Sequence, residues 1–175
     1  RSIEVLCVKG SGWDMGNIEP EGLPAVRLNQ LLELRNLDSL SDEDMVNFQR
    51  AALLNSSSPN PSVETLLHAF LPHKFIDHTH STAVLSITDQ VGDIKVLKEV
   101  YGDRVALVPY VKPGFDLAVS AARIFDLNKD VEGLILRKHG IFTFGSTALE
   151  SYERMIELVT LAEKRILKGK RKKFS

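Results

Sequence analysis

Several features that mark particular classes of protein are scarce or absent in this sequence. Its 175 residues include one cysteine, Cys7, which excludes an internal disulfide and favours a reducing, cytoplasmic compartment. No apolar run approaches the ~20 residues that a membrane-spanning helix needs, so we expect no membrane association. The first residues lack the regions of a signal peptide, no internal repeat is visible, and no GxGxxG motif indicates a dinucleotide site.

What is present is typical of a globular domain. Hydrophobic residues make up 43% of the chain and charged residues 26%, which excludes a disordered or fibrous protein. The length suits one domain of ordinary size. Because Arg1 is not a methionine and a strand-like stretch follows at once, we expect the chain to begin inside a longer protein, with a trimmed N-terminus as the alternative.

The net charge of −1 is the sum of two regions with opposite net charge. Residues 164–175 carry seven of the 22 Lys and Arg residues and none of the 23 Asp and Glu residues, so residues 1–163 have a net charge of −8. We therefore predict a globular domain over residues 1–163 and a basic tail or linker over residues 164–175. Such clusters can bind nucleic acid, but no aromatic or motif signal supports this, and solvated cations at a helix end are favoured.

Strand-like and helix-like segments alternate along the chain, which predicts an α/β fold with helices covering a sheet. Apolar spacing predicts helices over residues 23–37, 41–54, 63–71, 94–101, 114–125 and from residue 147 onward. Strands are expected over residues 2–9, 74–88, 105–111, 131–137 and 141–144. The step between the last two is short enough for a hairpin, so a purely parallel sheet is not assured.

Four of the five histidines lie between residues 68 and 80, and two of them form the motif His78-Thr79-His80. On a strand, side chains at i and i+2 point to the same face, so the two imidazoles can converge on one metal ion. Taken alone, the motif fits two surface or hydrogen-bonded histidines better, and a metal site needs further ligands.

His139 and Glu64 are the candidates for those further ligands. His139 follows an apolar run, at a strand end where functional side chains often lie, although a turn residue beside Gly140 is the better interpretation of it alone. Glu64 lies in the first turn of a predicted helix, where the helix dipole by itself favours a carboxylate.

The strings PSVETLLHAFLPHKFIDHTHSTAVLSI (Pro61–Ile87) and LILRKHGIFTFG (Leu134–Gly145) resemble the class II aldolase/adducin family. The likeness is greater to the aldolase-type domain of bifunctional proteins that join a rhamnulose-1-phosphate aldolase region to a short-chain dehydrogenase region. Lys9–Leu28 and Glu150–Lys164 extend it over nearly the whole chain. The resemblance implies a three-layer α/β/α sandwich with a mixed central sheet, and a homotetramer or other homo-oligomer.

The resemblance also implies a metal site and an activity. His78, His80 and His139 would bind Zn²⁺ or another divalent metal, with Glu64 as a fourth ligand or as the catalytic acid and base. The implied activity is that of a zinc-dependent aldolase, a lyase that cleaves or condenses a ketose or ketose phosphate through an enediolate. The candidates for binding a substrate phosphate are Gly10, Ser11, Gly12 and Ser62.

Departures from the family pattern leave alternatives open. In the family, a glycine-rich segment that helps to bind phosphate would precede Arg1. Val63 also replaces a hydroxyl residue of the family motif. Whether the substrate carries a phosphate group is therefore left open. Tyr101 is the candidate for the family's proton-donating tyrosine, although its surroundings match poorly. The alternatives are a metal-dependent epimerase, dehydratase or decarboxylase of the same fold, and a non-enzymatic interaction module like adducin.

Overall fold

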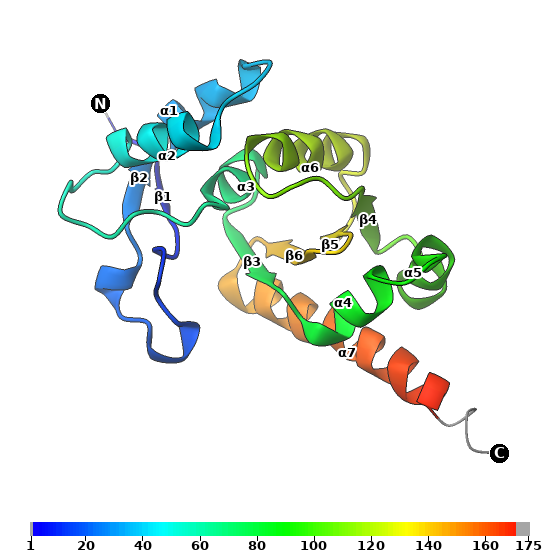
Figure 1. Cartoon of the computed structure of the whole chain (residues 1–175). Coiled ribbons are helices and arrows are strands. Elements are labelled where there is room, and N and C mark those ends of the chain that lie inside the picture. Colours follow the sequence, from blue (N-terminus) through cyan, green and yellow to red (C-terminus); the bar gives the residue numbers. More distant parts are fainter. Residues whose placement is uncertain (1, 171–175) are drawn as a thin grey trace. The chain divides into compact units, whose positions relative to one another are not determined.

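The structure, a computed structural model, describes residues 2–170 (Figure 1). The chain divides into two compact units. Unit 1 is Arg1–Pro72 with Val111–Ala122, and unit 2 is His73–Tyr110 with Arg123–Ser175. No helix found within residues 2–170 is long and apolar enough to cross a membrane.

Unit 1 consists of short elements around a two-stranded sheet. Strands β1 (Val5–Cys7) and β2 (Ala25–Arg27) pair antiparallel. The helices are η1 (Met15–Asn17), η2 (Pro20–Gly22), α1 (Leu28–Glu33), η3 (Leu34–Asn36), α2 (Asp42–Ala51), α3 (Thr65–Phe70) and the first part of α6 (Phe115–Leu127).

The helix predicted over residues 23–37 is wrong in its first part, which forms β2. Val26 is fully buried where it pairs with Leu6 of β1 and with Leu53, so its position in the core decides the backbone conformation. The guanidinium of Arg27 also donates to the Leu53 carbonyl over 2.8 Å. The helix α1 therefore begins only at Leu28.

Unit 2 contains a four-stranded sheet in the order β3-β6-β5-β4. Its strands are β3 (Phe75–Thr79), β4 (Val105–Val108), β5 (Gly133–Leu136) and β6 (Gly140–Gly145). Strand β6 runs antiparallel to both β3 and β5, whereas β4 and β5 are parallel. The sheet is therefore mixed, and β5 and β6 form the predicted hairpin.

Helices cover both faces of this sheet. On one face, where Figure 1 shows α7 beneath the strands, Ile141 of β6 belongs to a core that also contains residues of three helices. These helices are α4 (Thr82–Thr88), α5 (Asp93–Tyr101) and α7 (Ala148–Lys170). On the other face, Phe125 from the last turn of α6 packs edge-on against Phe144, with ring centroids 5.4 Å apart. The predicted α/β/α sandwich is confirmed.

The strand predicted over residues 74–88 is correct only as far as Thr79. The second half forms α4, because Val84, Ile87 and Thr88 recur at helical spacing and are all buried. A run rich in β-branched residues thus becomes helical because burial of one helical face outweighs the local preference.

Two helices begin with a side-chain cap. The Ser41 hydroxyl accepts the Asp44 N–H over 3.0 Å at the start of α2, and the Thr147 hydroxyl accepts the Glu150 N–H over 3.1 Å at the start of α7. Helix α7 then continues to Lys170, so the segment predicted as a basic tail begins inside a helix. Residues 171–175 of that segment lie outside the described residues, and the domain boundary at residue 163 stays a prediction.

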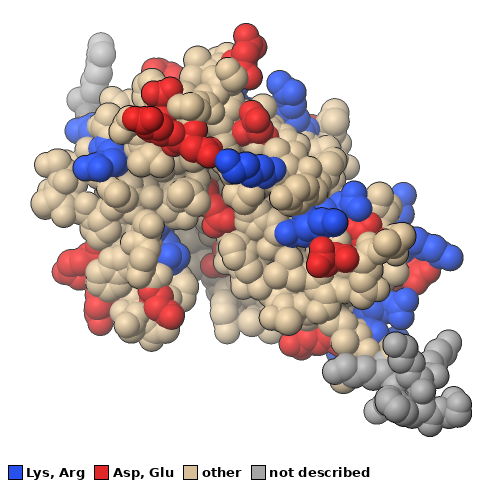
Figure 2. Space-filling model, viewed as in Figure 1, with Lys and Arg blue, Asp and Glu red and all other residues tan. Residues whose placement is uncertain are grey.

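Charged side chains of both signs are mixed on the face of the molecule that Figure 2 shows. Lys and Arg lie among Asp and Glu there, and the described residues of this face form no large basic patch.

Candidate metal centre

Three histidines of unit 2 meet at one end of the sheet. His78 is the penultimate residue of β3, His80 follows the end of that strand, and His139 lies in the turn between β5 and β6. The ring centroids of His78 and His80 are 4.8 Å apart, and that of His139 lies 5.4 Å and 4.8 Å from them. Each ring offers a nitrogen within 4.8 Å of the others, so one cation can contact all three.

The hydrogen bond of His78 determines which of its nitrogens is available to a metal. Its Nδ1 lies 2.9 Å from the Ile141 carbonyl oxygen, and because a carbonyl only accepts, Nδ1 must carry the proton. In the neutral ring Nε2 then has a lone pair, and it lies 3.0 Å from Nε2 of His80. Metal-bound histidines usually donate their second nitrogen to a carbonyl or carboxylate in this way.

The His78 ring is also held by packing. It stacks on Phe142 of the neighbouring strand, with ring centroids 4.0 Å apart and planes 15° from parallel. Phe142 is the residue opposite His78 in the β3–β6 register. The hydrogen bond and the stacking together fix the orientation of this imidazole before any ligand binds.

Gly140 lets the histidines approach the hairpin, a role that local sequence patterns do not predict. A Cβ atom at this position would lie 2.5 Å from the Thr79 carbonyl oxygen, 3.0 Å from Cε1 of His78 and 3.1 Å from Cδ2 of His80. Any side chain would therefore separate β3 from β6 or displace the rings. The available signal was the His139-Gly140 dipeptide at the end of an apolar run.

Glu64 belongs to unit 1, where it precedes the first residue of α3. Its backbone N–H donates to the Ser62 hydroxyl over 3.2 Å, and its carbonyl accepts the Leu67 N–H over 2.9 Å. The backbone at Glu64 thus starts the helix, as the sequence pattern predicted. Its role beside the histidines stays a prediction.

The Gly10-Ser11-Gly12 loop lies beside the PSVE segment within unit 1, but its amides are largely engaged. The Gly10 N–H donates to the Gly22 carbonyl over 2.7 Å and the Ser11 N–H to the Asn60 carbonyl over 2.8 Å. These two amides therefore cannot also bind a phosphate, so the expectation that the Gly10 and Ser11 amides contact a phosphate is wrong. The Gly12 amide and the hydroxyls of Ser11 and Ser62 stay predictions.

Tyr101 does not lie with the histidines. It is 2% exposed in the core formed with α4 and α7, and burial raises the pKa of its hydroxyl. Within the described residues the Tyr101 hydroxyl has no hydrogen-bond partner. A phenol buried in this way cannot reach a substrate, so the structure argues against the predicted proton donor.

His73 has a different environment from the three clustered histidines. Its ring stacks on Phe144 at 4.3 Å and meets Phe125 edge-on at 5.2 Å. Burial, with a smaller contribution from Arg154, lowers the pKa of this imidazole, and Glu150 opposes that effect. Its Nε2 is buried without a hydrogen-bond partner among residues 2–170, so this ring contributes to aromatic packing.

Comparisons with known proteins show the family of this chain. The family profile described as Class II Aldolase and Adducin N-terminal domain matches residues 2–166. The uncharacterized oxidoreductase YuxG of Bacillus subtilis (strain 168) is 38% identical over 166 residues, which are 95% of this chain and 24% of that protein. This chain therefore spans about a quarter of the length of that relative.

Solved structures extend the comparison. The N-terminal class II aldolase domain of a conserved protein from Thermoplasma acidophilum is 42% identical, with a TM-score of 0.89 over 94% of this chain and 76% of that one. An L-fuculose 1-phosphate aldolase shares the fold, at 17% identity and a TM-score of 0.62 over 95% and 71% of the two chains. With the family profile matching nearly its whole length, this chain belongs to the class II aldolase and adducin family.

Proposed function

We propose that this chain is the lyase domain of a metal-dependent aldolase, which cleaves or condenses a ketose or ketose phosphate. The carrying observation is the group of three imidazoles, in which the hydrogen bond from His78 to the Ile141 carbonyl leaves Nε2 as a lone-pair donor. Three neutral nitrogen donors suit Zn²⁺, and three protein ligands leave a position for substrate, as in catalytic rather than structural sites.

The ligands would be His78, His80 and His139. When bound, a divalent cation supplies a Lewis acid that stabilises negative charge on the substrate oxygens. The ligand atoms must be deprotonated, so we expect metal binding to weaken as the pH falls and the imidazoles protonate.

We assign the proton transfer to the carboxylate of Glu64. In the cleavage direction it takes the proton of the substrate hydroxyl while the adjacent carbon–carbon bond breaks. The electron pair of that bond moves toward the ketose carbonyl and gives an aldehyde and an enediolate. Return of a proton to the enediolate carbon then completes the ketone product, and the condensation runs the same steps in reverse.

A sugar phosphate is the favoured substrate class, because the L-fuculose 1-phosphate aldolase shares the fold. The Ser62 hydroxyl, held at the start of α3, is the retained candidate for contacting a phosphate. We further propose that the natural protein continues into a dehydrogenase region, as the greater length and the name of the Bacillus relative suggest. Assembly into a homo-oligomer and a cytoplasmic location stay predictions.

The experiment is a metal analysis of protein purified without chelator, followed by product analysis on a panel of ketoses and ketose phosphates. We expect about one divalent metal per chain, and two carbonyl fragments from a substrate by NMR. The double variant His78→Ala with His80→Ala should lose both the metal and the activity. His73→Phe, which keeps an aromatic ring on Phe144, is the matched control and should keep both.

Other outcomes separate the alternatives. A wild-type protein without stoichiometric metal would overturn the proposal and favour an interaction module. One isomeric product would indicate an epimerase, and loss of water or carbon dioxide would indicate a dehydratase or decarboxylase; each of these results overturns the lyase assignment.

A further inference from the structure

The turn that carries His139 has an uncommon conformation. Arg137, Lys138 and His139 join β5 to β6, and the His139 N–H donates to the Leu136 carbonyl over 3.0 Å. Lys138 has a φ of +61°, the one left-handed conformation among the non-glycine residues that the structure describes. Such a conformation costs about 1–3 kcal/mol, so it persists only where the surroundings fix it.

Two backbone contacts fix part of this turn. The Arg137 N–H donates to the Val108 carbonyl over 3.1 Å, which continues the β4–β5 pairing one residue beyond the strand. The Lys138 N–H donates to the hydroxyl of Thr88 over 3.2 Å, and Thr88 is fully buried at the end of α4. The turn is thereby attached to the neighbouring strand and to a helix of the core.

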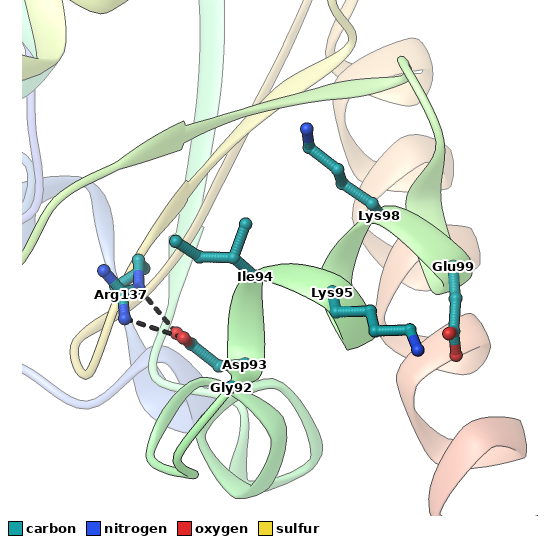
Figure 3. A pocket seen from close by; sticks show the side chains of 7 residues that line it. All are labelled: Gly92, Asp93, Ile94, Lys95, Lys98, Glu99 and Arg137. Atoms are coloured by element: carbon teal, nitrogen blue, oxygen red, sulfur yellow. Dashed lines mark hydrogen bonds and ion pairs between the residues drawn. The ribbon is translucent and has the colours of Figure 1, made fainter.

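The third attachment is an ion pair through the side chain of Arg137. Its Nε and Nη2 donate to the two carboxylate oxygens of Asp93 over 2.5 Å and 2.7 Å, as Figure 3 shows. The Asp93 side chain is 3% exposed, and it is the first residue of α5. A buried carboxylate held by both arms of a guanidinium allows little freedom to either partner.

The pair lies beside a hollow of about 780 Å³ that opens to solvent along α5. Its further lining residues include Ile94, Lys95, Lys98 and Glu99, all of which Figure 3 labels. The Arg137 guanidinium pairs with Asp93 of α5, and Arg137 itself is two residues from His139 in the turn. Arg137 is therefore placed to affect the position of His139 through the backbone of the turn.

We propose that Arg137 is a positioning residue, whose ion pair with Asp93 sets the turn so that His139 meets His78 and His80 at metal-binding distance. The inference rests on the proposed function, because it assumes that the three histidines bind a metal. Residues outside the ligand shell that orient ligands typically contribute 10–100-fold to metal affinity. The same contribution is expected from Arg137.

The test compares Arg137→Leu with Arg104→Leu in the full chain. Arg104 also pairs with carboxylates, of Glu132 and Glu157, but it lies where β4 and β5 begin, at the other end of the sheet. The readouts are the Zn²⁺ dissociation constant by chelator competition and the visible spectrum of the Co²⁺-loaded protein, which reports ligand geometry. Circular dichroism checks that each variant is folded.

We expect Arg137→Leu to raise the Zn²⁺ dissociation constant at least ten-fold and to change the Co²⁺ spectrum, whereas Arg104→Leu leaves both unchanged. Arg137→Lys, which keeps the charge but loses the two-armed geometry, should fall between them and serves if the leucine variant does not fold. Unchanged affinity and spectrum in either folded Arg137 variant would overturn the positioning role. A wild-type protein that binds no metal would instead overturn the proposed function.

Discussion

The two ends of the four-stranded sheet carry similar side chains in different surroundings. At the end where β6 begins, which we call the ligand end, three histidines meet and an arginine pairs with a buried carboxylate. At the end where β6 finishes, the far end, His73 contacts two phenylalanines, and an arginine pairs with one partly buried and one exposed carboxylate.

Burial is the main difference between the two arginine pairs. The Asp93 side chain of the ligand end is 3% exposed, whereas the Glu132 and Glu157 side chains of the far end are 29% and 59% exposed. Water screens an exposed pair, so breaking it changes little, but removing one partner of a buried pair leaves a charge without compensation. The pair of Arg137 with Asp93 therefore holds its segment in place more strongly than the pairs of Arg104 hold theirs.

The largest expected effect comes from Gly140→Ala at the ligand end. The new Cβ would lie 2.5 Å from the Thr79 carbonyl oxygen and 3.0 Å from the His78 ring, so β3 or the ring must move. We expect a loss of about 3 kcal/mol in the free energy of unfolding, measured in urea, and at least a ten-fold weaker Zn²⁺ affinity.

Gly133→Ala is the matched change at the far end of β5. Its Cβ would lie 2.4 Å from the Phe142 carbonyl oxygen, so a similar loss of stability is expected. The Zn²⁺ affinity of the folded protein should not change. Equal losses of affinity in both variants would mean that general destabilisation, and not the position of the rings, controls metal binding.

The next largest effect is a difference in the free energy of unfolding between variants that lack a partner of Arg137 and variants that lack a partner of Arg104. Asp93→Ala removes two hydrogen bonds between Arg137 and a buried carboxylate and should lower the free energy of unfolding by about 2 kcal/mol. Glu157→Ala removes an exposed partner of Arg104, which keeps Glu132, and should give a much smaller change. Urea unfolding of the two variants checks the comparison, and similar losses in both would contradict the role given to burial.

The smallest expected effect concerns His73 at the far end. Burial lowers the pKa of this imidazole in the folded protein, so below the ordinary histidine pKa of about 6.5 the unfolded chain binds a proton that the folded chain does not. Stability from the neutral ring is thus complete above that pH and declines as the pH falls. Arg154 strengthens the shift and Glu150 opposes it.

The measurement is the difference in the free energy of unfolding between wild type and His73→Phe, taken from pH 8 to pH 5. This difference cancels the contribution of the clustered histidines, which the two proteins share. We expect the wild type to lose stability relative to the variant as the pH falls. A difference that stays constant over this range would show that His73 has the same pKa in the folded and the unfolded chain, which contradicts the prediction.

Local patterns predicted those features that depend on neighbours in the sequence. The helices α2 and α7 begin within one residue of the predicted positions, where a hydroxyl caps an N–H three residues away. The spacing of His78 and His80 likewise brings their rings to 4.8 Å, although β3 ends between them. Such contacts follow from the geometry of one chain segment.

Features that depend on distant segments were mispredicted or missed. Residues 82–88 form α4 rather than a strand because one helical face is buried in the core, and Val26 adopts a strand because Leu6 and Leu53 flank it. Tyr101 lies at a suitable distance along the chain for a proton donor, but α5 directs it into the core.

The sequence by itself determined the α/β class, the family and the set of histidines, because these depend on periodicity and on motifs of a few residues. Only the tertiary structure decided that His139 meets His78 and His80, that Gly140 must lack a side chain, and that Arg137 pairs with Asp93, 44 residues away in the chain. These contacts form when β6 pairs with β3 and β5, and pairing between distant strands depends on packing of the whole unit rather than on local preference.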